Sequence, residues 1–204
     1  GMFMSISAEE IRKRAEEIRG QITEDRRNLH RIPELGMDLP QTSSYIRKRL
    51  DEMGIPWQDC GGDLPEKMTK DFMEAGFPRM ERAIGVTAVI GKGSPCILLR
   101  ADMDALPIRE ESDLEFKSCN GYGHMCGHDS HAAMLLGAAQ ILKDMEDSLK
   151  GSVKLVFQPG EETGAGARML VENGLLENPK VDAAFGIHVQ PVTGTGEVGY
   201  SVGV

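Results

Sequence analysis

The sequence predicts an α/β fold with a mostly parallel or mixed sheet flanked by helices. Short apolar segments of β-rich character recur along the chain, and segments with helical periodicity lie between them. Strands that alternate with helices are typical of crossover units, which build a sheet with helices on its faces. Each expected element follows from its own local pattern.

Two helices are expected to open the chain. Ser7 followed by Glu10 forms a capping box, and apolar residues at helical spacing then predict one long helix over residues 7–31. Two prolines interrupt the pattern, which resumes over residues 41–53. Gly54 can end that second helix, because glycine readily adopts the left-handed conformation found after helix C-termini.

The pattern changes after the second helix. Residues 58–82 mix turn-forming residues with one short helical stretch, and we interpret them as an excursion from the regular fold. Strands are then expected over residues 83–91, 96–101, 152–157 and 181–189. Helices are expected over residues 131–145 and 164–174, and residues 194–204 look extended.

Length and composition restrict the class of protein. A chain of 204 residues can bury a sizeable core, and one domain is the default expectation. The net charge of −9 opposes binding to nucleic acid, which needs clustered Lys and Arg. No apolar run approaches the roughly 20 residues that cross a bilayer, and no signal-peptide core is visible. These features predict a cytoplasmic protein without a membrane or nucleic-acid partner, and four scattered cysteines fit a reducing compartment.

Polar residues with metal-binding side chains follow the expected strands. Ligand sites in α/β sheets gather beyond the carboxyl ends of the strands, because loops and helix N-termini converge there. Four segments deliver such groups to this edge, namely "ADMD" with Asp102 and Asp104, "QPGEE" with Glu161 and Glu162, a strand ending in His188, and "HMCGHDSH" at 124–131. The joint arrival of these groups predicts a metal site.

Each segment also has a purely structural interpretation. Acidic residues after a strand are often solvated turn formers, and an acidic pair before a helix often complements the helix dipole. His188 could be a hydrogen-bonded core histidine. The 124–131 segment could be a polar loop whose Asp129 or Ser130 caps the following helix. The metal interpretation is favoured because four independent coincidences at one edge would otherwise be needed.

The residue types suggest which side chains bind metal and which act as a general base. Cys126 and His128 lie two positions apart in a glycine-containing loop, so both can turn toward one ion. Adjacent carboxylates point in different directions, so one of Glu161 and Glu162 can bind metal while the other acts as a general base. This division suits hydrolysis by metal-activated water, and Asp104 could orient a metal ligand.

A competing hypothesis makes Cys126 a nucleophile with a neighbouring histidine as its base. His124, His128 and His131 are all close enough in sequence to serve. This mechanism gives no role to the Glu161–Glu162 pair or to His188. The metal site therefore remains the preferred hypothesis.

Long motifs resemble a known enzyme family. The segments "LHRIPELG" (29–36), "LRADMDALPI" (99–108), "CGHDSHAAMLLGAAQIL" (126–142), "VFQPGEETGAGARMLVENG" (156–174) and "FGIHVQP" (185–191) are similar, in order, to motifs of the aminoacylase, hippurate hydrolase and indole-acetyl-amino-acid hydrolase family. These enzymes are metal-dependent amidohydrolases. The resemblance implies a zinc-exopeptidase-like catalytic domain with two divalent ions, such as Zn, Mn, Co or Ni, and an inserted lid and dimerisation domain.

The resemblance also implies roles for individual residues. Cys126, His128, Glu162 and His188 match the metal ligands of the family, and Glu161 matches its general base. Asp104 lies where the wider superfamily has a carboxylate that orients a metal ligand. The implied reaction is hydrolysis of the amide bond of a small N-acyl amino acid. Asp102, Asp129 and His131 stand in the motifs without an assigned role.

Two departures from the family pattern lead to further expectations. Residues 58–82 are longer than the usual connection, which suggests a role in substrate choice or at an interface. Family members continue beyond the equivalent of Val204 and supply a further histidine ligand, so residues 2–204 are expected to form the N-terminal part of the catalytic domain, truncated before the lid. We therefore expect a weakly held second ion and exposed apolar surface, together with either self-association or impaired activity. The alternative function is an impaired homologue that binds metal or a partner without turnover.

Overall fold

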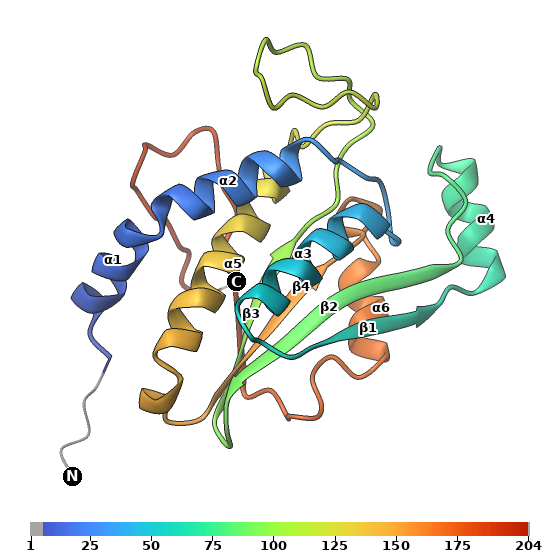
Figure 1. Ribbon diagram of the computed structural model, residues 1–204. Coiled ribbons are helices and arrows are strands. Elements are labelled where there is room, and N and C mark those ends of the chain that lie inside the picture. Colours follow the sequence, from blue (N-terminus) through green and yellow to red (C-terminus); the bar gives the residue numbers. More distant parts are fainter. Residues whose placement is uncertain (1–5, 204) are drawn as a thin grey trace.

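The computed structural model describes residues 6–203 and contains a five-stranded mixed sheet between layers of helices (Figure 1). The strands are β1 (Trp57–Asp63), β2 (Arg82–Gly91), β3 (Cys96–Asp102), β4 (Ser152–Gln158) and β5 (Ala183–Gly186), in the spatial order β1-β2-β4-β3-β5. The helices are α1 (Ala8–Glu17), α2 (Arg19–His30), α3 (Pro40–Glu52), α4 (Glu66–Glu74), α5 (His128–Asp144) and α6 (Gly166–Glu172), with short 3-10 turns η1 (Glu146–Ser148) and η2 (Glu161–Thr163). This architecture confirms the predicted α/β class.

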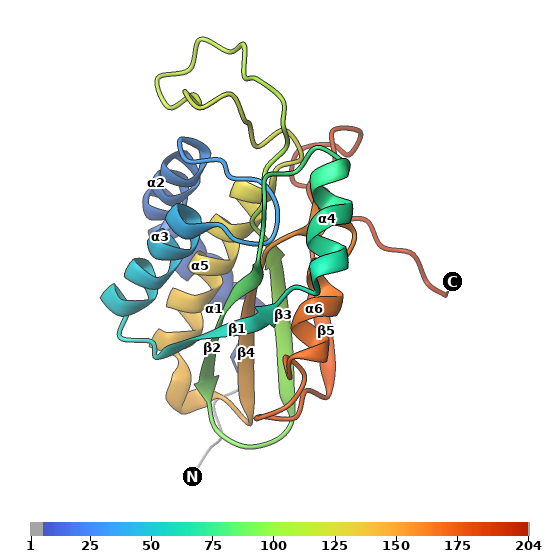
Figure 2. The same cartoon turned by 90° about the vertical axis from the view of Figure 1, so that its right-hand side faces the viewer.

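The helices lie on both faces of the sheet. Figure 2 shows α1, α2, α3 and α5 on one side and α4 and α6 on the other. The main core lies between α5 and the sheet, where Leu136, Leu155 and Phe157 are fully buried. Burial of such side chains stabilises a fold by about 1.5–3 kcal/mol each. The sheet and α5 therefore form a firm base for the strand ends.

The sheet is mixed because the connection between β2 and β3 is short. Parallel strands need a crossover of about a dozen residues or more, whereas residues 92–95 allow only a reversal. β4 lies between these two strands, antiparallel to β2 and parallel to β3, and β5 is parallel to β3. The carboxyl ends of β3, β4 and β5 consequently meet at one edge, as the sequence predicted.

The interpretation of residues 58–82 as an excursion was wrong in part, because β1 occupies its beginning. β1 pairs with β2 alone and has a mostly exposed or half-buried pattern that does not alternate cleanly. A Cβ at Gly61 would lie only 1.8 Å from the carbonyl oxygen of Ala83. Gly61 is therefore required for close backbone approach, although in sequence it resembles a turn residue. The expected short helix is α4.

The expectation of one helix over residues 7–31 was also wrong. Ser7 caps α1 through Glu10 N–H as predicted, but the helix is interrupted at Ile18, where φ is −102° and ψ is 9°. Ile22 of α2 approaches α5 so closely that a Cβ at Gly137 would lie 2.7 Å from its Cδ1. Both α1 and α2 pack against α5. Tertiary contact thus bends a segment whose spacing is uniformly helical.

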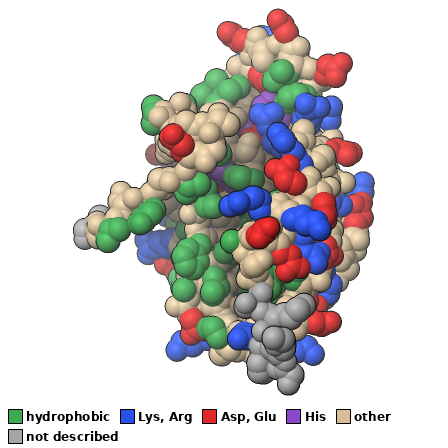
Figure 3. Space-filling model, turned by 90° about the vertical axis from the view of Figure 1, so that its left-hand side faces the viewer, with side chains coloured by type: hydrophobic (Ala, Val, Ile, Leu, Met, Phe, Trp, Pro, Cys, Tyr) green, Lys and Arg blue, Asp and Glu red, His purple; other side chains and the backbone are tan. Residues whose placement is uncertain are grey.

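Apolar surface remains exposed beside β5. Phe185 and Ile187 have exposed fractions of 59% and 65%, and an apolar groove of about 410 Å³ lies between α1 and α5. Hydrophobic side chains gather on one half of this face, with charged side chains on the other (Figure 3). Within residues 6–203, no helix combines the length and apolar composition needed to cross a membrane. Self-association remains a prediction, and a measurement of the molar mass in solution would test it.

Candidate metal centre

The predicted metal-binding side chains meet where β3, β4 and β5 end and α5 begins. Three groups have ligand atoms mutually within 4.8 Å, namely Cys126 with His128 and His188, Asp102 with His128 and His131, and His128 with Glu161 and Glu162. His128 belongs to all three groups, so it lies at the centre of the cluster. The structure therefore brings together all six candidates proposed from the sequence, since Asp104 contacts His128 directly.

His128 is held by the start of α5 and by Asp104. Gly127 adopts a left-handed conformation with φ of 86°, which turns the chain from Cys126 into the helix. The helix begins at His128, three residues before the position that the sequence suggested. The Nδ1–H of His128 donates to Asp104 Oδ1 at 3.1 Å, so Nε2 faces the cluster and is the nitrogen that can bind a metal ion. This arrangement matches the usual way in which a metal-binding histidine is oriented.

Asp104 also holds the acidic pair. Its Oδ2 accepts a hydrogen bond from the backbone N–H of Glu162 at 3.0 Å. Glu161 and Glu162 lie in η2, and their carboxylate oxygens are 3.8 and 3.7 Å from His128 Nε2. Asp104 therefore links two segments that are far apart in sequence and sets the distance between His128 and the glutamates.

His188 approaches the cluster from the segment after β5. Its Nδ1–H donates to the carbonyl oxygen of Val189 at 2.6 Å, so its Nε2 carries the lone pair. That Nε2 lies 3.6 Å from Cys126 Sγ. One imidazole nitrogen and one thiol sulfur thus converge at a distance that a shared metal ion can bridge.

Asp102 and His131 are part of the cluster, although the motifs assigned no role to Asp102, and His131 entered only as a possible base for a nucleophilic Cys126. The Nδ1–H of His131 donates to Asp102 Oδ1 at 2.5 Å, and both side chains are buried. Burial favours the neutral acid, but the His131 hydrogen bond and the charges of His128 and Arg100 lower the pKa of Asp102 overall. The three-residue spacing of His128 and His131 on α5 was the available signal, because such residues share a helix face.

The donor set fits divalent metal ions. His128 Nε2 and Glu162 Oε1 are buried and take part in no hydrogen bond in the structure, whereas the buried Asp102 Oδ2 lies 3.0 Å from Arg100 Nη1 in an ion pair. Buried polar atoms are rarely left without a partner, because the cost is about 1–3 kcal/mol for each. A combination of thiolate, imidazole and carboxylate suits Zn, Mn, Co and Ni. A bound cation would satisfy these atoms together.

The electrostatics of the cluster disfavour a nucleophilic cysteine. Burial, a hydrogen bond with Glu162 and the negative charges of Glu161, Glu162 and Asp102 raise the pKa of Cys126 to about 11. The thiolate is the reactive form, so a thiol with this pKa is a poor nucleophile near neutral pH. A bound divalent cation would lower the pKa of the Cys126 thiol and so favour the thiolate, which is the form that binds metal.

A second cluster around His30 fixes the surroundings of the centre. His30 Nδ1 lies 2.7 Å from Asp129 Oδ2, and its Nε2 lies 2.8 Å from Glu110 Oε1. Carboxylates only accept hydrogen bonds, so both ring nitrogens donate and His30 is an imidazolium. The hydrogen bond to Asp129 accordingly raises the pKa of His30, burial opposes the rise, and Glu110 adds to it.

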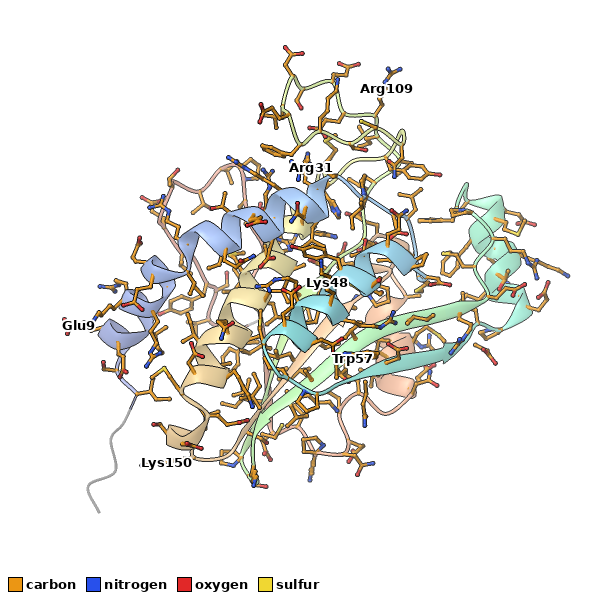
Figure 4. All side chains as sticks on the ribbon, viewed as in Figure 1. Glu9, Arg31, Lys48, Trp57, Arg109 and Lys150 are labelled. Carbon is orange, nitrogen blue, oxygen red and sulfur yellow. The ribbon has the colours of Figure 1, made fainter. Side chains whose placement is uncertain are left out.

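The His30 cluster joins three parts of the chain. His30 ends α2, Asp129 is in the first turn of α5, and Glu110 belongs to the loop that projects beyond these helices. Figure 4 shows Arg109 of this loop beyond Arg31 at the end of α2. The cluster therefore clamps the projecting loop to the two helices beside the metal centre.

The His30 clamp predicts a specific pH dependence of stability. The pKa of His30 is raised from 6.5, so its contribution is full below pH 6.5 and is lost as pH rises through the folded-state pKa. Burial alone would raise the pKa of Glu110, but hydrogen bonds from Ser112, His30 and the Ser118 N–H lower it from 4.5 to about 2, so its contribution is full above pH 4.5. The clamp should be strongest between these limits.

Urea unfolding of the metal-free protein and of His30→Gln can test this dependence. The difference in unfolding free energy between them should be larger at about pH 5.5 than at about pH 8.5, because His30 loses its charge as pH rises. A difference that stays constant over this range would show that the charged clamp does not contribute.

Comparison with known proteins agrees with the geometry. A family model described as peptidase family M20/M25/M40 matches residues 98–203, a range that includes every member of the metal cluster. The chain belongs to this family. The M20 assignment confirms the resemblance to metal-dependent amidohydrolases that the sequence motifs indicated.

Individual relatives are similar over most of this chain. It is 44% identical to IAA-amino acid hydrolase ILR1-like 5 of Arabidopsis thaliana over 175 residues, which are 85% of this chain and 35% of that relative. It is 41% identical to N-acetyl-L-cysteine deacetylase of Bacillus subtilis strain 168 over 181 residues, which are 87% of this chain and 38% of that relative. The chain thus spans little more than a third of the length of these M20 relatives.

A solved structure supports the same fold. A Bacillus subtilis protein described as a dinuclear metal-binding peptidase of the M20 family matches with a TM-score of 0.70 and 37% identity. The match covers 87% of this chain and 45% of that protein. The mixed sheet with flanking helices is therefore the fold that this chain shares with a dinuclear member of the family.

Proposed function

We propose that this chain carries the metal centre of an M20 amidohydrolase that cleaves the amide bond of small N-acyl amino acids. Cys126, His128, Glu162 and His188 are the proposed ligands of two divalent ions, of which the second is held weakly. The observation that supports the proposal best is the set of buried atoms without hydrogen bonds around His128 Nε2. The names of the two relatives, an amino-acid-conjugate hydrolase and a deacetylase, support the substrate class.

The proposed chemistry divides between the ions and the side chains. Bound divalent ions lower the pKa of water and polarise a carbonyl group. Glu161, whose side chain is 39% exposed, can reach a substrate and accept the proton of the attacking water. The same carboxyl group would then donate that proton to the departing amide nitrogen. A carboxylate can transfer a proton in this way only if it does not itself bind a metal ion.

Asp104 has a positioning role in this proposal. Its two oxygens bind the His128 Nδ1–H and the Glu162 N–H, so one carboxylate orients two proposed ligands. Such partners keep a ligand in the correct tautomer and direction. A cytoplasmic location is part of the same proposal.

A hydrolysis assay with and without metal tests the proposed function. The protein is treated with a chelator, reloaded with Zn, Mn, Co or Ni, and incubated with N-acetyl, N-benzoyl and indole-acetyl amino acids. We expect free amino acid from the reloaded protein and none from the chelated protein, because the attacking water depends on the metal. Equal turnover in both samples would contradict a metal-dependent reaction. Bound metal without hydrolysis of any substrate would instead favour the non-enzymatic alternative.

A further inference from the structure

The imidazole ring of His131 is hydrogen-bonded on both sides, to Asp102 and to the backbone of Val189. His131 Nδ1 lies 2.5 Å from Asp102 Oδ1, and its Nε2 lies 3.0 Å from the backbone nitrogen of Val189. Val189 directly follows His188, a proposed ligand. We propose that Asp102 and His131 form a positioning relay that sets His188 in place for the metal centre. This inference rests on the proposed function, because it takes His188 as a ligand.

The two contacts define the tautomer of His131. Asp102 Oδ1 accepts a hydrogen bond, so Nδ1 carries the proton. The Val189 N–H is a donor, so Nε2 must accept with its lone pair. His131 is therefore neutral, with both nitrogens engaged, and has no free lone pair to offer a metal. This distinguishes His131 from His128 and His188, whose Nδ1 atoms are hydrogen-bonded and whose Nε2 atoms remain available to a metal ion.

The segment that carries His188 depends on contacts outside the sheet. β5 has four residues and pairs with β3 only as far as Gly186. Beyond that point the backbone leaves the ladder, and the Val189 N–H bonds to a side chain of α5. The His131 hydrogen bond therefore replaces the strand pairing that would otherwise hold this segment.

Packing at Gly127 holds the same segment from a second side. A Cβ at Gly127 would lie 2.3 Å from Cγ2 of Val189, so the Val189 side chain occupies the space that this glycine leaves open. Gly127 separates Cys126 from His128. The rings of His131 and His188 also meet edge to face, with centroids 4.6 Å apart. These contacts bring the His188 segment against the Cys126–His128 turn, where His188 Nε2 is 3.6 Å from Cys126 Sγ.

Two variants of His131 separate its two contacts. The amide oxygen of Gln can take the place of Nε2, and the amide nitrogen of Asn can take the place of Nδ1. His131→Asn keeps the donor to Asp102 and loses the acceptor for Val189, whereas His131→Gln does the reverse. We expect His131→Asn to weaken Zn²⁺ binding by about 10- to 100-fold, the usual effect of losing such a partner, and His131→Gln to weaken it clearly less.

The readout is the Zn²⁺ dissociation constant from competition with a chelating indicator. Equal losses in both variants, or no loss in either, would overturn the relay. The visible spectrum of the Co²⁺-loaded protein adds a second criterion, because thiolate-to-cobalt charge transfer from Cys126 should persist in His131→Asn while the ligand-field bands change. Tyr45→Phe is the matched control, since it removes a hydrogen bond to Asp25 away from the centre and should leave the Zn²⁺ affinity unchanged.

Two further measurements separate this inference from the proposed function. His188→Ala should weaken Zn²⁺ binding at least as much as His131→Asn, and unchanged affinity would contradict the proposed ligand set itself. Loss of affinity in His188→Ala without any loss in His131→Asn would contradict the relay alone. In the metal-free protein, long-range ¹H–¹⁵N spectra should show His131 protonated at Nδ1 and not at Nε2. The opposite tautomer would also overturn the relay.

Discussion

Glu161→Gln is expected to lower kcat for hydrolysis of an N-acyl amino acid by about 10²- to 10⁴-fold, the range attributed to general acid–base catalysis. The amide keeps the size of the side chain but cannot accept a proton. Glu161 is not among the proposed ligands, and its side chain is more exposed than that of Glu162. The metal content of Glu161→Gln should therefore equal that of the unchanged protein. Steady-state kinetics and elemental analysis provide the two measurements.

Glu162→Gln is the natural comparison, because it changes the adjacent residue in the same way. We expect this variant to lose metal affinity as well as turnover, since Glu162 Oε1 is one of the buried atoms without a hydrogen bond. The roles assigned to the pair would be reversed if Glu161→Gln lost metal and Glu162→Gln retained it. Intact turnover in Glu161→Gln would eliminate Glu161 as the base.

Divalent metal is expected to stabilise the folded protein strongly, and His128→Ala is expected to remove that effect. A ligand that binds only the folded state at 100 times its dissociation constant adds about 2.7 kcal/mol to the unfolding free energy. His128 is fully buried and belongs to all three groups of potential ligands. Without the His128 side chain, the three groups of potential ligands lose the one residue that they share. Urea unfolding with excess Zn²⁺ and with chelator measures the difference.

Glu110→Gln provides the control for this experiment. Glu110 belongs to the His30 clamp, and its hydrogen bonds go to His30, Ser112 and Ser118. The variant should be less stable than the unchanged protein but should retain the full increase in unfolding free energy on adding Zn²⁺. An equal increase in His128→Ala would mean that the metal binds elsewhere.

Part of the mixed sheet could have been predicted in more detail from the sequence. The connection 92–95 is too short for a parallel crossover, so it already implied an antiparallel relation between β2 and β3. Two errors in the predicted fold could not have been avoided. The glycines of β1 resemble a turn until Gly61 is seen against the Ala83 carbonyl, and the bend at Ile18 follows from packing on α5.

The sequence by itself determined which side chains gather at the proposed centre. Cys126 and His128 are neighbours in the chain, Glu161 and Glu162 are adjacent, and both groups and His188 lie at ends of elements. The carboxyl ends of parallel strands share an edge, so local patterns were enough to predict that these residues meet.

Only the tertiary structure decided what each histidine does. His131 contacts residues 29 and 58 positions away, and His30 contacts residues 80 and 99 positions away. An imidazole bound by a carboxylate and an N–H is a neutral positioning group, whereas one bound by two carboxylates is a cation. Those partners come from separate elements that folding brings together. Local sequence can therefore indicate that a histidine is present at a site, but its protonation depends on the contacts that folding creates.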